Sequence, residues 1–96
     1  MAINSTPFIR LSINRFGFSA LDVRINILGT DDTKTIAVNL LSTMTKASSL
    51  EDLDWLSQQY DLACKKYSVN KDDGGTQFHV GDDLVSIIRY DEPTIY

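Results

Sequence analysis

The chain has 96 residues, 43% of them hydrophobic and 23% charged, a composition typical of one folded domain with a single core. Its net charge of -4 argues against a general nucleic-acid binder, because neutralising phosphates needs clustered Lys and Arg, and the nine here are scattered. The single cysteine excludes an internal disulfide, and no stretch approaches the roughly 18 apolar residues that span a bilayer, so we expect a cytoplasmic protein.

The first predicted element is a β-hairpin. In residues 8–16, and again in residues 21–27, aliphatic and polar side chains alternate, which places the aliphatic ones on one face of each strand. The short link between the two runs contains Gly17. A small basic patch would form if the hairpin brought three arginines onto its exposed face, although Asp22 on that face would dilute it: Arg10, Arg15 and Arg24.

Residues 34–41 fit two structures. Ile36, Val38 and Leu40 alternate as in a strand, whereas Ile36, Leu40, Leu41 and Met44 also fit one stripe of a helix. The β-branched residues of this segment favour the strand. We therefore predict a third strand, which leaves an exposed sheet edge.

A helix is predicted from Ser48 to about residue 67. Ser48 and Glu51 have the spacing of a capping box, in which each side chain accepts a hydrogen bond from the other residue's amide. Apolar side chains at spacings of three and four form one stripe: Leu50, Leu53, Leu56, Tyr60, Ala63, Cys64 and Tyr67. On such a stripe the Cys64 thiol is expected to behave as a small hydrophobic group.

Residues 76–80 and 84–90 form a second predicted hairpin, interrupted by Gly81-Asp82-Asp83. The sequence thus predicts an α+β, two-layer domain over residues 1–96, with an antiparallel sheet of about five strands (β-β-β-α-β-β) and one main helix across one face. Residues 1–7 and 91–96 are expected to be flexible or peripheral ends outside this core.

The segment 71–84 contains four aspartates and the only histidine, His79. Asp and Gly are the residues that turns require, so we interpret Asp72-Asp73-Gly74-Gly75 and Gly81-Asp82-Asp83 as turns. A calcium loop would need oxygen ligands at alternating positions and a closing Glu, and here two glycines follow the first aspartates instead. A metal-dependent or hydrolytic enzyme would have to use Asp72, Asp73, His79, Asp82 and Asp83.

Trp55 lies well away from the apolar stripe of the predicted helix, so it either packs locally or contacts another molecule. Acidic doublets at several turns and element ends, such as Asp72-Asp73 and Asp82-Asp83, can present a negative surface with phosphate-like spacing. A set of partner-binding residues follows from these two features: Trp55, Asp72, Asp73, Asp82 and Asp83.

The sequence thus predicts a small, acidic, non-enzymatic protein, without cofactor or metal, that binds and inhibits a larger protein or ribonucleoprotein complex with a basic surface. One concrete form is a phage-encoded inhibitor of a bacterial nucleic-acid-handling or defence complex, such as a CRISPR interference complex, acting in the host cytoplasm. No family motif carries this assignment. The alternatives are a homo-oligomeric structural domain, paired through an edge strand at 34–41 or through Trp55, and, less favoured, the metal-dependent enzyme.

Overall fold

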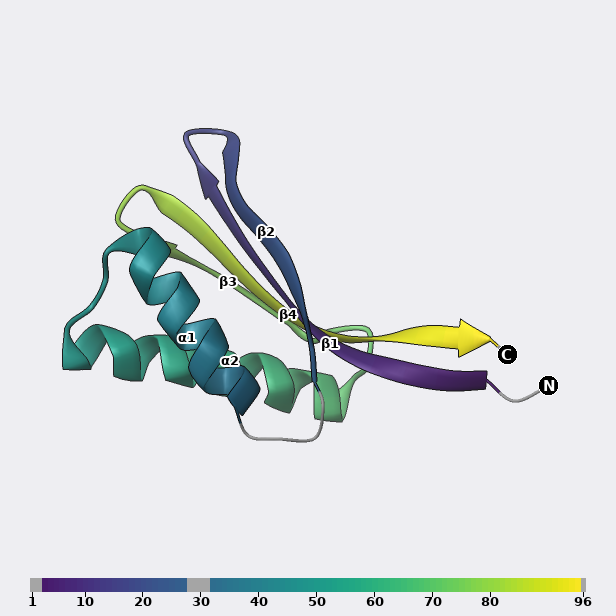
Figure 1. The fold of residues 1–96 in the computed structure, drawn as a ribbon. Coiled ribbons are helices and arrows are strands. Elements are labelled where there is room, and N and C mark those ends of the chain that lie inside the picture. The colour runs from purple at the N-terminus through teal and green to yellow at the C-terminus, as the bar shows by residue number, and fades with distance from the viewer. Residues whose placement is uncertain (1–2, 28–31, 96) are drawn as a thin grey trace.

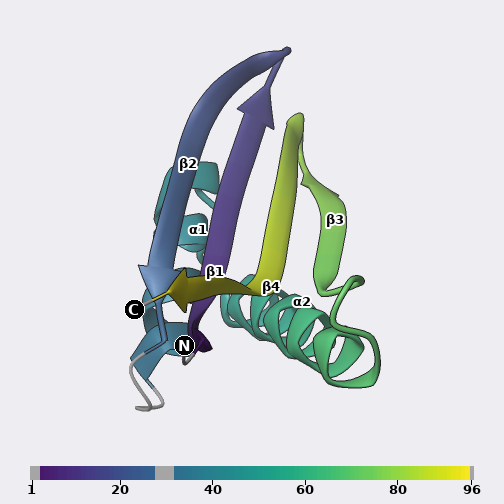
Figure 2. The same cartoon turned by 90° about the vertical axis from the view of Figure 1, so that its right-hand side faces the viewer.

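The computed structural model describes residues 3–27 and 32–95, with side chains for residues 5–27 and 32–93. It is an α+β domain in which a four-stranded antiparallel sheet, in the order β2-β1-β4-β3, carries two helices on one face (Figures 1 and 2). The elements in chain order are β1 (Ile3–Arg15), β2 (Phe18–Asn26), α1 (Asp32–Thr45), α2 (Leu50–Val69), β3 (Gly75–Val80) and β4 (Asp83–Ile95). Among the described residues, no helix combines the length and the apolar character needed to cross a membrane.

Both predicted hairpins are confirmed. In the first, Leu11 pairs with Val23, and the two-residue turn at Phe16-Gly17 has positive φ at both positions, 53° and 83°. These angles belong to the turn type whose twist matches that of the flanking strands. In the second hairpin, Val80 pairs with Asp83 around a turn in which Gly81 has φ 60°.

The prediction of a strand at residues 34–41 is wrong, because this segment lies within α1. Ala37, Val38 and Leu41 are buried, at helical spacings that no strand would bring to one face. The prediction gave too much weight to the β-branched residues, and burial of a helical stripe against the sheet outweighed their preference. The sheet therefore has four strands, not five, and two helices cover it, not one.

The predicted helix after residue 48 is confirmed as α2, with a correction at its start. The cap is Ser49, one residue later than predicted, whose hydroxyl accepts a hydrogen bond from the Asp52 amide at 3.0 Å. The helix continues to Val69, and the buried side of its stripe consists of Leu56, Tyr60 and Ala63.

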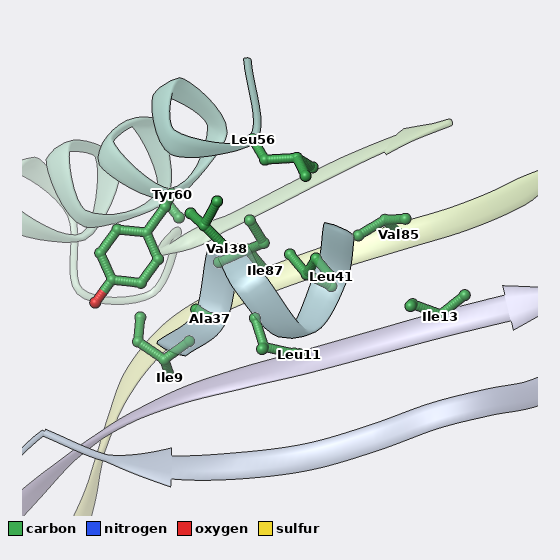
Figure 3. Packing of buried hydrophobic residues seen from close by; sticks show 11 residues of the cluster. Ile9, Leu11, Ile13, Ala37, Val38, Leu41, Leu56, Tyr60, Val85 and Ile87 are labelled. Atoms are coloured by element: carbon green, nitrogen blue, oxygen red, sulfur yellow. The ribbon is translucent and has the colours of Figure 1, made fainter. Parts of the chain in front are cut away.

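The core lies between the sheet and the two helices (Figure 3). The sheet contributes five aliphatic side chains, which face residues from both helices: Ile9, Leu11, Ile13, Val85 and Ile87 opposite Ala37, Val38, Leu41, Leu56, Tyr60 and Ala63. The aliphatic positions that alternate in β1 are therefore the buried ones, as the period-two pattern predicts.

The chain ends expected to be peripheral form paired strand ends. Residues 3–7 of β1 pair with residues 91–95 of β4, from Ile3 opposite Ile95 to Pro7 opposite Asp91. This two-stranded ribbon projects from the body of the domain (Figure 1) and lies outside the buried cluster.

Candidate functional site

The turns of the two hairpins are neighbours at one end of the sheet. Arg15, the last residue of β1, pairs with Asp83, the first residue of β4. The Phe16-Gly17 turn, which follows β1, therefore lies beside the Gly81-Asp82 turn, which precedes β4 (Figure 1). Together with the end of α1 they surround a shallow hollow of about 360 Å³, lined by Arg15, Phe16, Thr45, Lys46, Val80, Gly81, Asp82 and Asp83. We call these residues, with Phe18, the hairpin-tip surface.

Two aromatic side chains of this surface face solvent: Phe16 is 75% exposed and Phe18 is 77% exposed. Phe16 also occupies the left-handed region, with φ 53°, at a turn position where Asn, Asp or Gly is favoured. With three quarters of its surface exposed, Phe16 contributes little burial to the core. A strained, exposed aromatic residue is the kind of feature that points to a binding role.

Sequence reasoning missed both phenylalanines because it treated the stretch around Gly17 only as a connection between two strands. A signal was present: two aromatic residues flank the turn glycine, Gly17, where polar residues usually stand. Reading the turn for what it exposes, as well as for its geometry, would have identified them.

Asp83, a predicted partner-binding residue, has a structural role. It is only 6% exposed, and its two carboxylate oxygens accept hydrogen bonds from Arg15 Nε and Arg15 NH2 at 2.7 and 2.9 Å. The same guanidinium donates to the carbonyl oxygen of Met44 at 3.0 Å, so this contact joins both hairpins to the end of α1. The hydrogen bond from Arg15 lowers the pKa of Asp83 below its ordinary value.

We expect Asp83→Asn to lower the melting temperature at neutral pH, because it removes the acceptor charge of this pair. A lowered folded-state pKa means that the stabilisation is complete above the unfolded-state pKa of about 3.9 and is lost as the pH falls through the folded-state value. Melting curves of wild type and variant, recorded from pH 7 into the acid range, should therefore converge at low pH. Asp82→Asn is the control and should melt like wild type throughout; a deficit for Asp83→Asn that is constant with pH would contradict the assignment.

The other predicted acidic residues are not brought together. Asp82 is exposed at the hairpin tip, whereas Asp72 and Asp73 lie in the link between α2 and β3. The six residues of β3 separate these two places by roughly 20 Å, at about 3.3 Å per residue. Asp73 also forms an ion pair with Lys66 at 3.4 Å, and the Asp72 amide donates to Asn70 Oδ1 at 3.0 Å, as in an Asx-turn.

Trp55 packs locally. It is half-buried, and its ring meets Phe78 of β3 edge-on, with 4.9 Å between the ring centroids. This contact attaches α2 to the outer strand of the sheet. Replacing Trp55 would therefore change packing inside the domain, which makes it a poor probe of partner binding.

His79 and Cys64 show no shared arrangement. His79 is exposed on the sheet face that the helices leave uncovered, opposite in direction to Phe78 and Val80 as predicted. Cys64 is half-buried beside the core, and desolvation raises the pKa of its thiol. Nowhere in the described part of the chain do three or more His, Cys, Asp or Glu side chains cluster as a metal site would require.

The three-arginine patch considered above does not form. Arg10 and Arg24 share the uncovered face, but Arg10 donates two hydrogen bonds to Asp22, at 2.9 and 2.8 Å, and Arg24 donates one to Glu92 at 2.7 Å. Arg24 also lies over the Phe8 ring, 5.1 Å from its centroid. Arg15 is occupied by Asp83, as described above.

The charges left over are mostly acidic. Among the described residues, six ion pairs occupy six of the basic side chains: Arg10, Arg15, Arg24, Lys34, Lys66 and Arg89. Within that part of the chain, the ionised side chains outside these pairs are Asp32, Glu51, Asp52, Asp54, Asp72 and Asp82, against Lys46, Lys65 and Lys71. Comparisons of this chain with protein-family models, with curated proteins and with solved structures find no match.

Proposed function

We propose that this chain is a small non-enzymatic protein that binds a larger macromolecular partner with a basic surface and inhibits it, using the hairpin-tip surface as its main contact. The observation that carries the proposal is the pair of exposed phenylalanines at the first hairpin turn, Phe16 and Phe18, of which Phe16 shares the hollow with Asp82 and Lys46. Aromatic anchors supply most of the energy in protein interfaces, and surrounding charges supply orientation and association rate.

The support for a basic partner is the excess of unpaired carboxylates over the described chain, six against three lysines, of which Lys46 lines the hairpin-tip hollow with Asp82. With six cationic side chains engaged inside the domain, the unpaired carboxylates include exposed residues at the start of α2 (Glu51 and Asp54) and at the hairpin tip (Asp82). Such charges attract a positively charged surface over a distance of about 8–10 Å at ordinary salt concentrations.

In its most specific form, the partner is a bacterial nucleic-acid-handling or defence complex, and the protein is a phage-encoded inhibitor of it. Support for this version comes from the small size and from the excess of unpaired carboxylates, because basic nucleic-acid channels attract acidic proteins. Two of the predicted contact residues, Asp83 and Trp55, are engaged inside the domain, so the proposal assigns the contact to Phe16, Phe18 and Asp82 instead.

The test is capture of partners from bacterial lysate with tagged protein at low and at high salt, followed by mass spectrometry. We expect a nucleic-acid-binding complex to be captured at low salt and released at high salt. Phe16→Asn should reduce its capture about tenfold or more, since loss of an interface anchor costs over about 1.4 kcal/mol. Asp82→Asn should weaken capture less and should reduce its salt dependence.

Phe16→Asn is a suitable variant because Asn is favoured at this turn position, so the hairpin keeps its geometry. The matched control is Val69→Asn, which removes an apolar side chain that is 83% exposed at the end of α2, away from the hairpin tips. Equal capture by wild type, Phe16→Asn and Asp82→Asn would show that the hairpin-tip surface is not the contact.

A further inference from the structure

Strand β2 forms an edge of the sheet with its outer backbone groups unpaired among the described residues. The Ile27 amide donates to the Pro7 carbonyl at 2.9 Å, and in an antiparallel ladder every second residue makes such bonds. Leu21, Val23 and Ile25 therefore direct their backbone groups toward β1, whereas Asp22 and Arg24 direct theirs outward. β2 contains no Pro and no Lys, which commonly protect an edge from pairing with another chain, and its one irregularity lies at Ala20, before the stretch 21–25.

The helix side of this edge is apolar and incompletely covered. Three side chains of β2 are only half-buried: Leu21, Val23 and Ile25. The flank of α1 that faces α2 carries Lys34 and Val38, and Ile36 and Leu40 lie about 120° or more from both of them around the helix, on the opposite flank. That opposite flank is also apolar and at least partly exposed, with Ile36 51% exposed and Leu40 and Met44 half-buried.

We propose that two copies of this chain pair antiparallel through their β2 strands, with Val23 at the two-fold axis, and form a continuous eight-stranded sheet. In this register Asp22 lies opposite Arg24 of the partner subunit, and Arg24 opposite the partner's Asp22. The outward backbone groups of both residues then form the hydrogen-bonded pairs of the ladder. On the helix side, Leu21 lies opposite the partner's Ile25, which adds apolar cross-strand pairs.

Other registers are disfavoured by the same residues. A shift of the partner by two residues places Asp22 opposite the partner's Asp22, or Arg24 opposite the partner's Arg24, and like charges directly opposite each other are destabilising. A shift by one residue turns the apolar face of one strand toward the polar face of the other. The register centred on Val23 alone pairs opposite charges and keeps both faces consistent.

The charged side chains on the uncovered face of β1 and β2 also favour pairing with a second copy of this chain. Arg10 and Arg24 are directly opposite each other across β1 and β2, which is an unfavourable cross-strand pair. Asp22 and Glu92 offset it by accepting hydrogen bonds from these arginines. In the dimer, the partner's Asp22 places a further carboxylate in this row, beside Arg24.

This dimer goes beyond the proposed function and does not depend on it. The turns with Phe16 and Asp82 lie beyond the paired stretch, residues 21–25, so each copy keeps its hairpin-tip surface. The sequence alternative of a homo-oligomer placed the paired edge strand at residues 34–41, which are helical. The dimer proposed here pairs through β2, which does form an edge of the sheet.

The test uses light scattering of wild-type protein from about 10 µM to 1 mM, where we expect the mass to rise to that of a dimer. Asp22→Arg and Arg24→Asp should each be monomeric over most of this range, because each places like charges opposite each other twice. An equimolar mixture of the two variants should recover the dimer, because one chain then presents only arginines and the other only aspartates at the facing positions.

The matched control is the same pair of charges on the other edge strand, Gln77→Arg and Gln77→Asp, where Gln77 is exposed on the same sheet face. These variants should dimerise like wild type, alone and mixed. Wild type that stays monomeric at 1 mM, or a dimer that both β2 variants leave intact, would overturn the proposal, as would folded variants whose mixture stays monomeric.

Amide hydrogen exchange of the wild type tests the proposal without any substitution, and so covers the case in which a variant does not fold. The Asp22 and Arg24 amides point outward in one chain and should exchange fast when dilute, then become protected at concentrations where the mass is dimeric. Fast exchange of both amides in the dimer would exclude pairing through β2.

Discussion

Leu41→Ala is expected to lower the free energy of unfolding by about 2–5 kcal/mol, the usual cost of emptying a fully buried leucine site. Leu41 is 0% exposed and lies in the centre of the core, between α1 and the sheet (Figure 3). The loss combines the transfer free energy of the three deleted carbon atoms, Cγ and both Cδ, with the cost of the cavity left behind. Urea unfolding curves give the difference, with an unchanged slope if the unfolded state is unaffected.

The control for Leu41→Ala is Ile36→Ala. In the helix Leu41 is buried and Ile36 exposed, whereas in a strand Ile36 would be on the buried face and Leu41 on the other. Ile36 is 51% exposed in α1, so its truncation should cost about 0.5 kcal/mol or less when measured on dilute protein. If residues 34–41 were a strand with Ile36, Val38 and Leu40 on its buried face, Ile36→Ala would be the costly variant. Equal losses, or a larger loss at Ile36, would contradict the helix.

Gly74→Ala is expected to destabilise the fold by about 1–3 kcal/mol, as overpacking of a close contact does. A Cβ at Gly74 would stand 2.2 Å from the Arg89 carbonyl oxygen and 3.0 Å from Tyr67 Cβ, so the backbone of β4 or the end of α2 would have to move. The present approach is fixed by a hydrogen bond from the Arg89 amide to the Gly74 carbonyl at 2.7 Å.

Gly75→Ala is the matched control in the same glycine pair. A Cβ there would find its nearest neighbour, Ile88 Cγ1, at an ordinary 3.6 Å. The substitution should therefore be neutral or slightly stabilising, because alanine also reduces the freedom of the unfolded chain. Thermal melts of both variants distinguish these outcomes, and a tolerated Gly74→Ala would show that the close approach to β4 is not needed.

The position of Gly74 matters because it lies beside a cluster that attaches the end of α2 to β4. The Arg89 guanidinium lies over the Tyr67 ring, 4.2 Å from its centroid, and donates to Asp91 Oδ1 at 2.8 Å. The Tyr67 hydroxyl donates to Asp91 Oδ2. The sequence predicts a turn at Asp72-Asp73-Gly74-Gly75, and the structure places Gly75 at the start of β3, while the described glycines with positive φ are Gly17 and Gly81. The first glycine of the pair instead leaves room for the backbone of β4 to approach.

Much of the fold is local and could be predicted. The two hairpins follow from period-two alternation around turn glycines, and α2 follows from a capping serine and an apolar stripe that agree with one another. Each of these signals depends on residues within a few positions of each other, so one sequence is enough to read them. The two-layer α+β arrangement then follows, because an amphipathic sheet and an amphipathic helix bury their apolar sides together.

Residues 34–44 show where local pattern is insufficient. Their apolar side chains satisfy both a strand and a helix, and the choice depends on what the rest of the sheet offers. The sheet presents an apolar face that needs covering, and Ala37, Val38 and Leu41 bury against it only when the segment is helical, so it covers the face as α1. That outcome depends on contacts between elements far apart in the chain.

The acidic pair Asp82-Asp83 shows the same division within two residues. As sequence they are two aspartates in a turn, and the sequence alone determined the turn itself, through local backbone preferences. Only the tertiary structure decided that Asp83 is buried while Asp82 is exposed, because Arg15, 68 residues earlier in the chain, is brought within 2.7 Å of Asp83 by the pairing of β1 with β4. The reason is physical: the backbone conformation of a tight turn depends on residues adjacent in sequence. The burial and the charge partners of its side chains depend on which strands pair.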